Sequence, residues 1–182
     1  FPHTGVTVYK DSTNRVPGIA ISTNDANLLS NRLSKGSVKL YIKTDCKTIG
    51  MKQAPSVIGE MKGSQHPDEI LLVGGHLDSW DVGQGAHDDG AGCVQSIEVL
   101  RIFSAIGYTP KRTIRAVLFS NEENGLAGGK TYAQVSNQKG EFHLAALESD
   151  SGGFSPRGFS FEADTSVFKT YYKNVSKWLP IL

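Results

Sequence analysis

The stretch LLVGGHLDSWDVGQGAHDDGAG at residues 71–92 carries the strongest structural signal in the chain. The apolar run 70–73, bounded by two glycines, is typical of a short buried strand. That strand delivers His76 and Asp78 to its carboxyl end, and because strand residues alternate between faces, both side chains are expected on one side. Clustered His and Asp residues at a strand end indicate hard-metal or zinc chemistry.

Two further apolar runs also end in acidic residues. Residues 113–120 (TIRAVLFS) predict a buried strand that leads into Glu122 and Glu123. Residues 144–147 predict a third strand, which leads into Asp150. Ligands of open α/β sheets bind at the carboxyl ends of the strands. We therefore expect the three acidic clusters to converge, although they lie far apart in the sequence.

The order of the predicted elements indicates an α/β fold with a mostly parallel mixed sheet sandwiched by helices. The expected strands are at 56–61, 70–75, 113–120, 144–149 and 158–162, and the expected helices are at 91–106, 125–137 and 165–178. Strand 56–61 is expected to run antiparallel beside strand 70–75, because a short polar loop joins them. In the first part of the chain, short strands at 18–22 and 38–44 are expected to flank a helix at 24–34.

Composition excludes several classes of protein. Nineteen basic and eighteen acidic residues give a formal net charge of +1, which does not favour nucleic acid or an anionic membrane as a partner. No apolar run approaches the roughly 18 residues that a membrane-spanning helix needs. Two cysteines are too few for a disulfide framework. Cys93 is expected to be a packed thiol within an apolar helix, and Cys46 is expected to be exposed.

These motifs resemble the M28 family of dinuclear zinc exopeptidases, and within it the carboxypeptidase Q (plasma glutamate carboxypeptidase) branch. The residues that carry the resemblance are GGHLDSWDVGQGAHDDGAG at 74–92, PKRTIRAVLFSNEENGLAGG at 110–129 and ALESDSGG at 146–153. The resemblance implies a zinc exopeptidase fold of the phosphorylase/hydrolase-like type. It also implies that residues 1–50 are the C-terminal part of a protease-associated (apical) domain and that residues 51–182 are a partial catalytic domain.

The family pattern implies metal-ligand roles for four residues. Two zinc ions are implied per complete catalytic domain, with His76 on the first ion and Asp88 bridging both. Glu123 completes the protein ligands of the first ion, and Asp150 binds the second. A carboxylate between two cations roughly 3.5–4 Å apart offsets their mutual repulsion. The ligand atoms of His76 and Asp88 are therefore expected within about 3–4 Å of each other, as two groups that share one zinc.

Two residues have catalytic roles in the family pattern. Glu122 is implied as the general base that takes a proton from the metal-activated water. Asp78 is implied to orient His76 by holding the ring nitrogen that does not bind metal, at roughly 2.6–3.2 Å. The family also implies a cis peptide bond between Asp88 and Asp89.

One family ligand has no counterpart in this chain. The second metal takes a further histidine downstream of the position of Asp150, whereas the histidines here are at 3, 66, 76, 87 and 143. We therefore expect only Asp88 and Asp150 on the second metal, and we expect the chain to be a fragment cut at both ends. His87 is a candidate replacement ligand, but alternation beside Asp88 predicts that its side chain points elsewhere.

The resemblance implies a metallo-exopeptidase, a carboxypeptidase or dipeptidase acting on small peptides with free termini. The alternatives are an M28 aminopeptidase and a catalytically silent binding module on the same fold. The residues that the family pattern assigns to the metals are all present except the downstream histidine, and their presence favours an active enzyme over a silent binding module. The expected partner is a small peptide or dipeptide, without nucleic acid or a membrane span, and a homodimer is an option for the full-length protein. The sequon Asn174-Val175-Ser176 fits a secreted or lysosomal glycoprotein.

Overall fold

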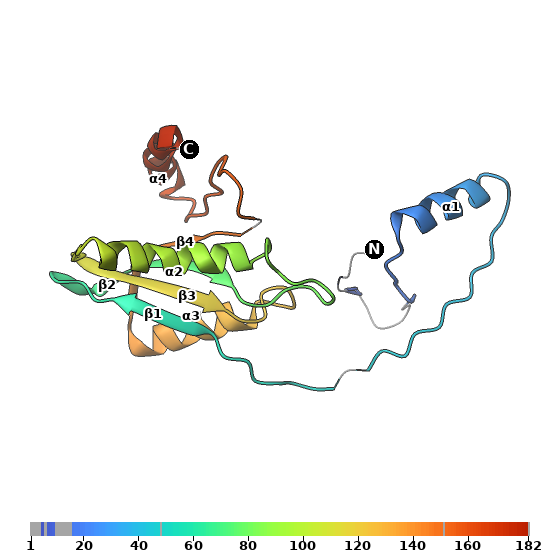
Figure 1. Ribbon diagram of the computed structural model, residues 1–182, viewed down its shortest axis with the longest axis horizontal. Coiled ribbons are helices and arrows are strands. Elements are labelled where there is room, and N and C mark those ends of the chain that lie inside the picture. Colours follow the sequence, from blue (N-terminus) through green and yellow to red (C-terminus); the bar gives the residue numbers. More distant parts are fainter. Residues whose placement is uncertain (1–4, 6, 10–15, 48, 151, 182) are drawn as a thin grey trace.

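The computed structural model describes residues 5, 7–9, 16–47, 49–150 and 152–181 (Figure 1). Within these residues, four strands form one sheet in the order β1-β3-β2-β4. The strands are β1 (Val57–Met61), β2 (His66–His76), β3 (Arg112–Phe119) and β4 (Phe142–Glu148). Strand β2 is parallel to both β3 and β4, and β1 is antiparallel to β3. The predicted mixed, mostly parallel sheet is confirmed.

The position of β1 corrects the expected pairing. Strand β1 is antiparallel to β3, with Gly59 opposite Ala116, and it does not pair with β2. The loop between β1 and β2 explains the difference, because it crosses the start of β3 and is held there. The Gly63 N–H donates to Thr113 Oγ1 at 3.0 Å, and the Ser64 N–H donates to the Pro110 carbonyl at 2.9 Å. The chain thus passes over β3 and enters the sheet again on its other side.

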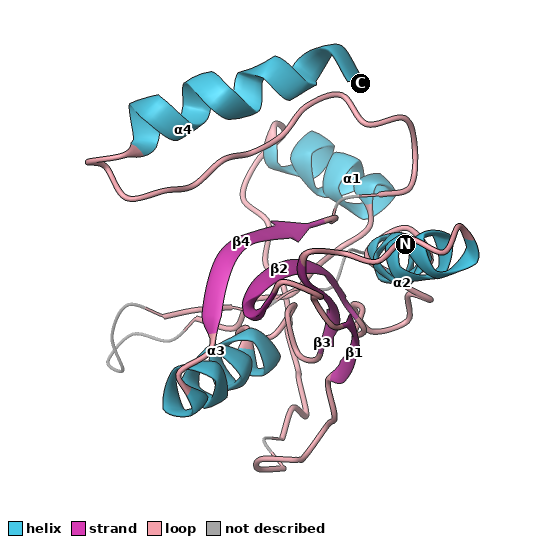
Figure 2. Cartoon of the chain, turned by 90° about the vertical axis from the view of Figure 1, so that its left-hand side faces the viewer, coloured by secondary structure: helices cyan, strands magenta, loops and turns pink. Residues whose placement is uncertain are grey.

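Helices cover both faces of the sheet. Helix α2 (Gly90–Ala105) lies on one face and helix α3 (Ala127–Lys139) on the opposite face, as Figure 2 shows. Helix α1 (Thr23–Leu33) lies away from the sheet (Figure 1). Its N-cap, Ser22, accepts a hydrogen bond from the Asp25 N–H at 3.1 Å, which satisfies one of the unpaired donors at the helix start. Three of the four predicted helices, at 24–34, 91–106 and 125–137, are confirmed within one to two residues at each end.

Three predicted strands are absent from the described residues. Segments 18–22, 38–44 and 158–162 have extended or irregular backbone without ladder hydrogen bonds. Apolar alternation indicates a strand only where a partner strand satisfies the backbone groups, and none of the described strands pairs with these three segments. The expected helix 165–178 is instead a short helix α4 (Phe168–Val175) followed by the 3-10 helix η1 (Ser176–Ile181).

The buried core lies along the central strands β2 and β3 and against α2. Its apolar members are Ile70, Leu72, Cys93, Ile114, Ala116, Val117 and Leu118. Strands β2, β3 and β4 are parallel, so their carboxyl ends meet at one edge of the sheet. Within the described residues, no helix is both long enough and apolar enough to cross a membrane.

Candidate metal centre

His76 is the last residue of β2, and its side chain is almost fully buried, with 1% of its surface exposed. Its main-chain N–H donates to Asp89 Oδ2 at 2.9 Å, and its Nδ1 lies 2.9 Å from the Asp78 main-chain carbonyl. A carbonyl oxygen only accepts hydrogen bonds, so Nδ1 carries the proton. The Nε2 atom is therefore the nitrogen with a lone pair available for a metal.

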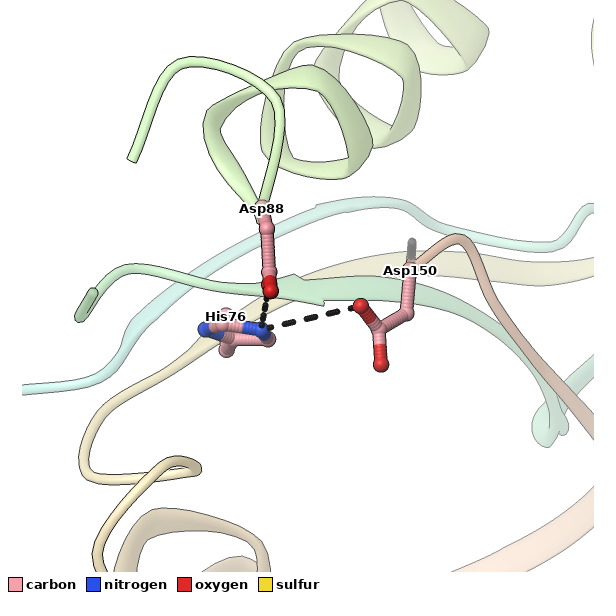
Figure 3. Close-up of side chains that lie close together, drawn as sticks. All are labelled: His76, Asp88 and Asp150. Carbon is pink, nitrogen blue, oxygen red and sulfur yellow. Dashed lines mark ion pairs between the residues drawn. The ribbon is translucent and has the colours of Figure 1, made fainter. Parts of the chain in front are cut away.

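Two carboxylates lie close to that nitrogen (Figure 3). The distance from His76 Nε2 to Asp88 Oδ1 is 3.1 Å, and the distance to Asp150 Oδ1 is 3.9 Å. One ligand atom from each of the three residues lies within 4.8 Å of the other two. Asp88 comes from the loop before α2 and Asp150 from the segment after β4, so the sheet edge does bring these residues together. The expected separation of His76 and Asp88 is confirmed.

Negative charge is concentrated around the imidazole. Burial by itself lowers the pKa of His76, but the hydrogen bond to Asp78 and the charges of Asp89, Glu122 and Asp150 outweigh burial and raise it. The Oε2 atom of Glu122 is 4.0 Å from His76 Nε2. Several carboxylates facing one imidazole repel each other, and a cation among them relieves that repulsion.

Glu123 provides a separate test of whether a metal fits here. Its Oε1 atom is buried and has no hydrogen-bond partner among the described residues. Burial, followed by the charge of Asp88, raises the pKa of Glu123. A buried carboxylate oxygen without a partner is unfavourable, and a cation would satisfy it. With an imidazole nitrogen and nearby aspartates, this donor set fits zinc.

The structure does not place Glu123 in the group of three. That group joins Asp150 to His76 and Asp88, whereas the family pattern pairs Glu123 with His76 and assigns Asp150 to the second metal. Glu123 is nevertheless close enough for the charges of His76 and Asp88 to affect its pKa. The division of ligands between two metals stays a prediction.

Asp78 has a different role from the one expected of its carboxylate. Its Oδ1 atom is 3.8 Å from His76 Nδ1, which is too long for a hydrogen bond. The main-chain carbonyl of Asp78 holds the ring instead. The carboxylate accepts hydrogen bonds from the main-chain N–H groups of Glu122 at 2.9 Å and Glu123 at 3.2 Å. The alternation of side chains along a strand correctly predicts that Asp78 lies on the same side of the sheet as His76. The chain bends after β2, however, and the bend turns the main-chain carbonyl of Asp78 toward the His76 ring.

Asp89 is a site residue that the sequence reasoning missed. Only 1% of its surface is exposed, and its two oxygens accept from the main-chain N–H groups of His76 and Gly92, each at 2.9 Å. It is the N-cap of α2, and an Asp directly before a run of small residues is a recognisable helix-start signal. The peptide bond between Asp88 and Asp89 is cis, as the resemblance implies.

Gly92 allows α2 to begin against the site. A Cβ at this position would lie 1.9 Å from the Ser149 carbonyl oxygen, so only glycine fits without a shift of backbone. The close approach brings the loop that carries Asp88 next to the segment that carries Asp150. His87 lies outside the group of three, and its ring packs against Phe154 with the ring centres 5.0 Å apart. This agrees with the expectation that His87 points elsewhere.

Comparison with known proteins identifies the family. The sequence pattern of peptidase family M28 matches residues 56–179, and the chain therefore belongs to that family. It is 40% identical over 161 residues to carboxypeptidase Q from Pongo abelii and 39% identical over 161 residues to carboxypeptidase Q from Homo sapiens. Each comparison covers 88% of this chain and 34% of the relative, so the chain spans about one third of these proteins.

A solved structure supports the same assignment. The crystal structure of a peptidase M28 precursor from Shewanella amazonensis SB2B matches with a TM-score of 0.73 and 34% sequence identity. The match covers 98% of this chain and 41% of the other. A probable zinc metalloprotease from Pyrenophora teres f. teres is 38% identical over 100 residues, which cover 50% of this chain and 21% of that protein. The resemblance read from the sequence motifs is confirmed.

Proposed function

We propose that the protein carrying this chain is a zinc-dependent exopeptidase, a carboxypeptidase or dipeptidase that hydrolyses small peptides with free termini. The observation that carries the proposal is the convergence of His76 Nε2, Asp88 Oδ1 and Asp150 Oδ1 within 4.8 Å of one another. Membership of family M28 supports it, as do the relatives named carboxypeptidase Q and probable zinc metalloprotease.

The proposed metal ligands are His76, Asp88, Glu123 and Asp150, with two zinc ions in a complete catalytic domain. Bound zinc would polarise the scissile carbonyl and acidify the attacking water. The second zinc would take only Asp88 and Asp150 from this chain, fewer than the three or four protein ligands that zinc usually has. We therefore expect the chain alone to bind one zinc firmly and the second weakly.

Glu122 is the proposed general base. Its carboxylate reaches to within 4.0 Å of His76 Nε2, and 31% of its side chain is exposed. The carboxylate thus faces the proposed metal centre while water and substrate can reach it. In this role it accepts a proton from water and delivers it to the leaving amine. The short loop after β3 supplies both this base and the neighbouring ligand Glu123.

We further propose that residues 1–50 belong to a protease-associated domain and residues 51–182 to the M28 catalytic domain. The family match begins at residue 56, which supports placing residues 1–50 outside the catalytic domain. We also propose a secreted or lysosomal location, which the exposed Asn174 of the sequon supports. Enzymatic release of N-linked glycan from the native protein, followed by mass spectrometry, tests that location.

Two substitutions test the catalytic assignment. Glu122→Gln removes a proton acceptor, so zinc content should stay near that of the parent while turnover falls roughly 10²- to 10⁴-fold. His76→Ala removes a ligand, so zinc content should fall as well. Zinc is measured by elemental analysis, and turnover is measured on the whole protein that carries the chain. Near-parental turnover in Glu122→Gln would remove Glu122 from the role, and unchanged zinc in His76→Ala would refute the first metal site.

Blocked peptides separate the proposed activity from the alternatives. A carboxypeptidase cleaves an N-acetylated peptide with a free carboxylate, an aminopeptidase cleaves a C-amidated peptide with a free amine, and a dipeptidase requires both ends free. Cleavage of the amidated peptide alone would favour the aminopeptidase. If the protein binds zinc and peptide but hydrolyses neither of the two blocked peptides nor a dipeptide with both ends free, the catalytically silent module would be favoured.

A further inference from the structure

We propose that Asp78 is a positioning residue whose carboxylate fixes the main chain of Glu122 and Glu123. The inference rests on the proposed function for its consequence, because Glu122 is the proposed base and Glu123 a proposed ligand. It gives Asp78 two separate tasks. The side chain holds the glutamate loop, and the main-chain carbonyl holds the ring of His76.

The hydrogen bonds that carry the inference use both carboxylate oxygens. Asp78 Oδ1 accepts from the Glu122 N–H at 2.9 Å, and Oδ2 accepts from the Glu123 N–H at 3.2 Å. Hydrogen bonds to an ionised acceptor are roughly twice as strong as those between neutral groups. With 26% of its side chain exposed, Asp78 is largely shielded from competing water. One side chain therefore restrains two successive residues of the site.

The local backbone explains why a carboxylate fits at this point. Asn121 precedes the two glutamates and has a left-handed backbone with φ of 63°. Successive N–H groups beside a left-handed residue face the same way and form a small concavity that binds anions. In this protein the anion is the side chain of Asp78, which comes from the end of β2. The contact thus joins the carboxyl end of β2 to the loop that follows β3.

Removal of the carboxylate should affect the two sides of the site differently. The His76 ring would keep its hydrogen bond to the Asp78 carbonyl, because that acceptor belongs to the backbone. The main chain of Glu122 and Glu123 would lose its two acceptors. A displacement of about 1 Å in a catalytic group lowers the rate by roughly 10²-fold. We therefore expect the base to be misplaced while the imidazole remains in position.

Amide hydrogen exchange in the metal-free 182-residue chain tests the contact directly. In Asp78→Ala, exchange of the Glu122 and Glu123 amides should rise roughly 10- to 100-fold, the effect of losing a hydrogen bond to a charged group. The amide of Leu77, which donates to the Phe119 carbonyl at 2.7 Å, should stay protected and reports on the fold. Asp68→Asn, at an exposed carboxylate on β2, is the matched control and should change none of the three.

Asp78→Asn keeps the size of the side chain, and it tests the same contact if Asp78→Ala does not fold. Its amide retains one acceptor oxygen, so one glutamate amide should stay protected while the other exchanges faster. Parental exchange of both glutamate amides in Asp78→Asn, with Leu77 protected, would overturn the proposal. The same result in a folded Asp78→Ala would also overturn it.

Turnover separates positioning from a merely structural role. In the whole protein, Asp78→Asn should lower kcat roughly 10- to 100-fold with little change in KM or in the fraction of folded protein. A loss of folded protein with parental kcat per folded molecule would refute positioning. The exchange result needs neither zinc nor substrate. Failure of Glu122→Gln to lower turnover would therefore refute the proposed base without affecting the contact, and unchanged exchange would refute the contact without affecting the base.

Discussion

Replacement of Glu141 by Gln is expected to destabilise the chain in a manner that depends on pH. Glu141 accepts hydrogen bonds from Arg115 Nη1 at 2.8 Å and Nη2 at 3.2 Å, and it also accepts one from Ser136 Oγ at 2.9 Å. Arg115 Nη1 donates to Tyr132 Oη at 2.9 Å as well. Side-chain exposure is only 12% for Arg115 and 21% for Glu141. The carboxylate therefore links β3, α3 and the start of β4 through one half-buried ion pair.

The size of the effect follows from the pKa of Glu141. The hydrogen bonds from Arg115, partly opposed by burial, lower that pKa from its ordinary 4.5 to about 2. Such a shift corresponds to about 3 kcal/mol of stability at neutral pH, and partial exposure reduces the expected contribution to about 2 kcal/mol. Because the folded-state pKa is depressed, this stability is fully present above pH 4.5 and is lost as the pH falls toward 2.

Urea unfolding of the parent and of Glu141→Gln at several pH values measures this contribution. The difference in unfolding free energy should be about 2 kcal/mol at pH 7 and should fall below about half of that at pH 3. Glu98→Gln, which breaks the exposed pair with Arg101, is the matched control and should change stability little at either pH. A difference for Glu141→Gln that stays constant from pH 7 to pH 3 would refute the argument from ionisation.

Four further outcomes are expected from the packing and the metal centre. Gly92→Ala places a Cβ 1.9 Å from the Ser149 carbonyl oxygen and should destabilise the chain by about 1–3 kcal/mol in urea. Gly129→Ala, on α3 with no atom within 4 Å of the added Cβ, should stabilise it by about 0.5–1 kcal/mol, and equal effects at the two sites would contradict the packing. Iodoacetamide should label the exposed Cys46 well before Cys93, because burial raises the pKa of Cys93 to about 11; equal labelling by mass spectrometry would show that Cys93 is accessible. Calorimetric titration of the chain with zinc should show one tight ion, and two equally tight ions would show that a further ligand completes the second site.

Local sequence patterns were sufficient to place the main parts of the site. An apolar run bounded by glycines predicts β2, and the position of His76 at its end follows from that strand alone. The small residues after Asp89 predict where α2 begins. Parallel strands bring their carboxyl ends to one edge, so the meeting of His76, Asp88 and Asp150 could also be predicted. These features depend on hydrophobic periodicity and on the alternation of strands with helices along the chain, and both can be recognised in the sequence itself.

Other features were decided only by tertiary structure, because they depend on which segments lie side by side. The loop after β1 is held by Thr113 and Pro110, and this contact places β1 beside β3. Segment 158–162 alternates like a strand, yet it is not part of the sheet, whose described strands are β1 to β4. The two tasks of Asp78 depend on a bend after β2 and on the approach of the Glu122 loop from β3. Alternation determines the face on which a side chain lies, but the partner it meets there is set by a distant part of the chain.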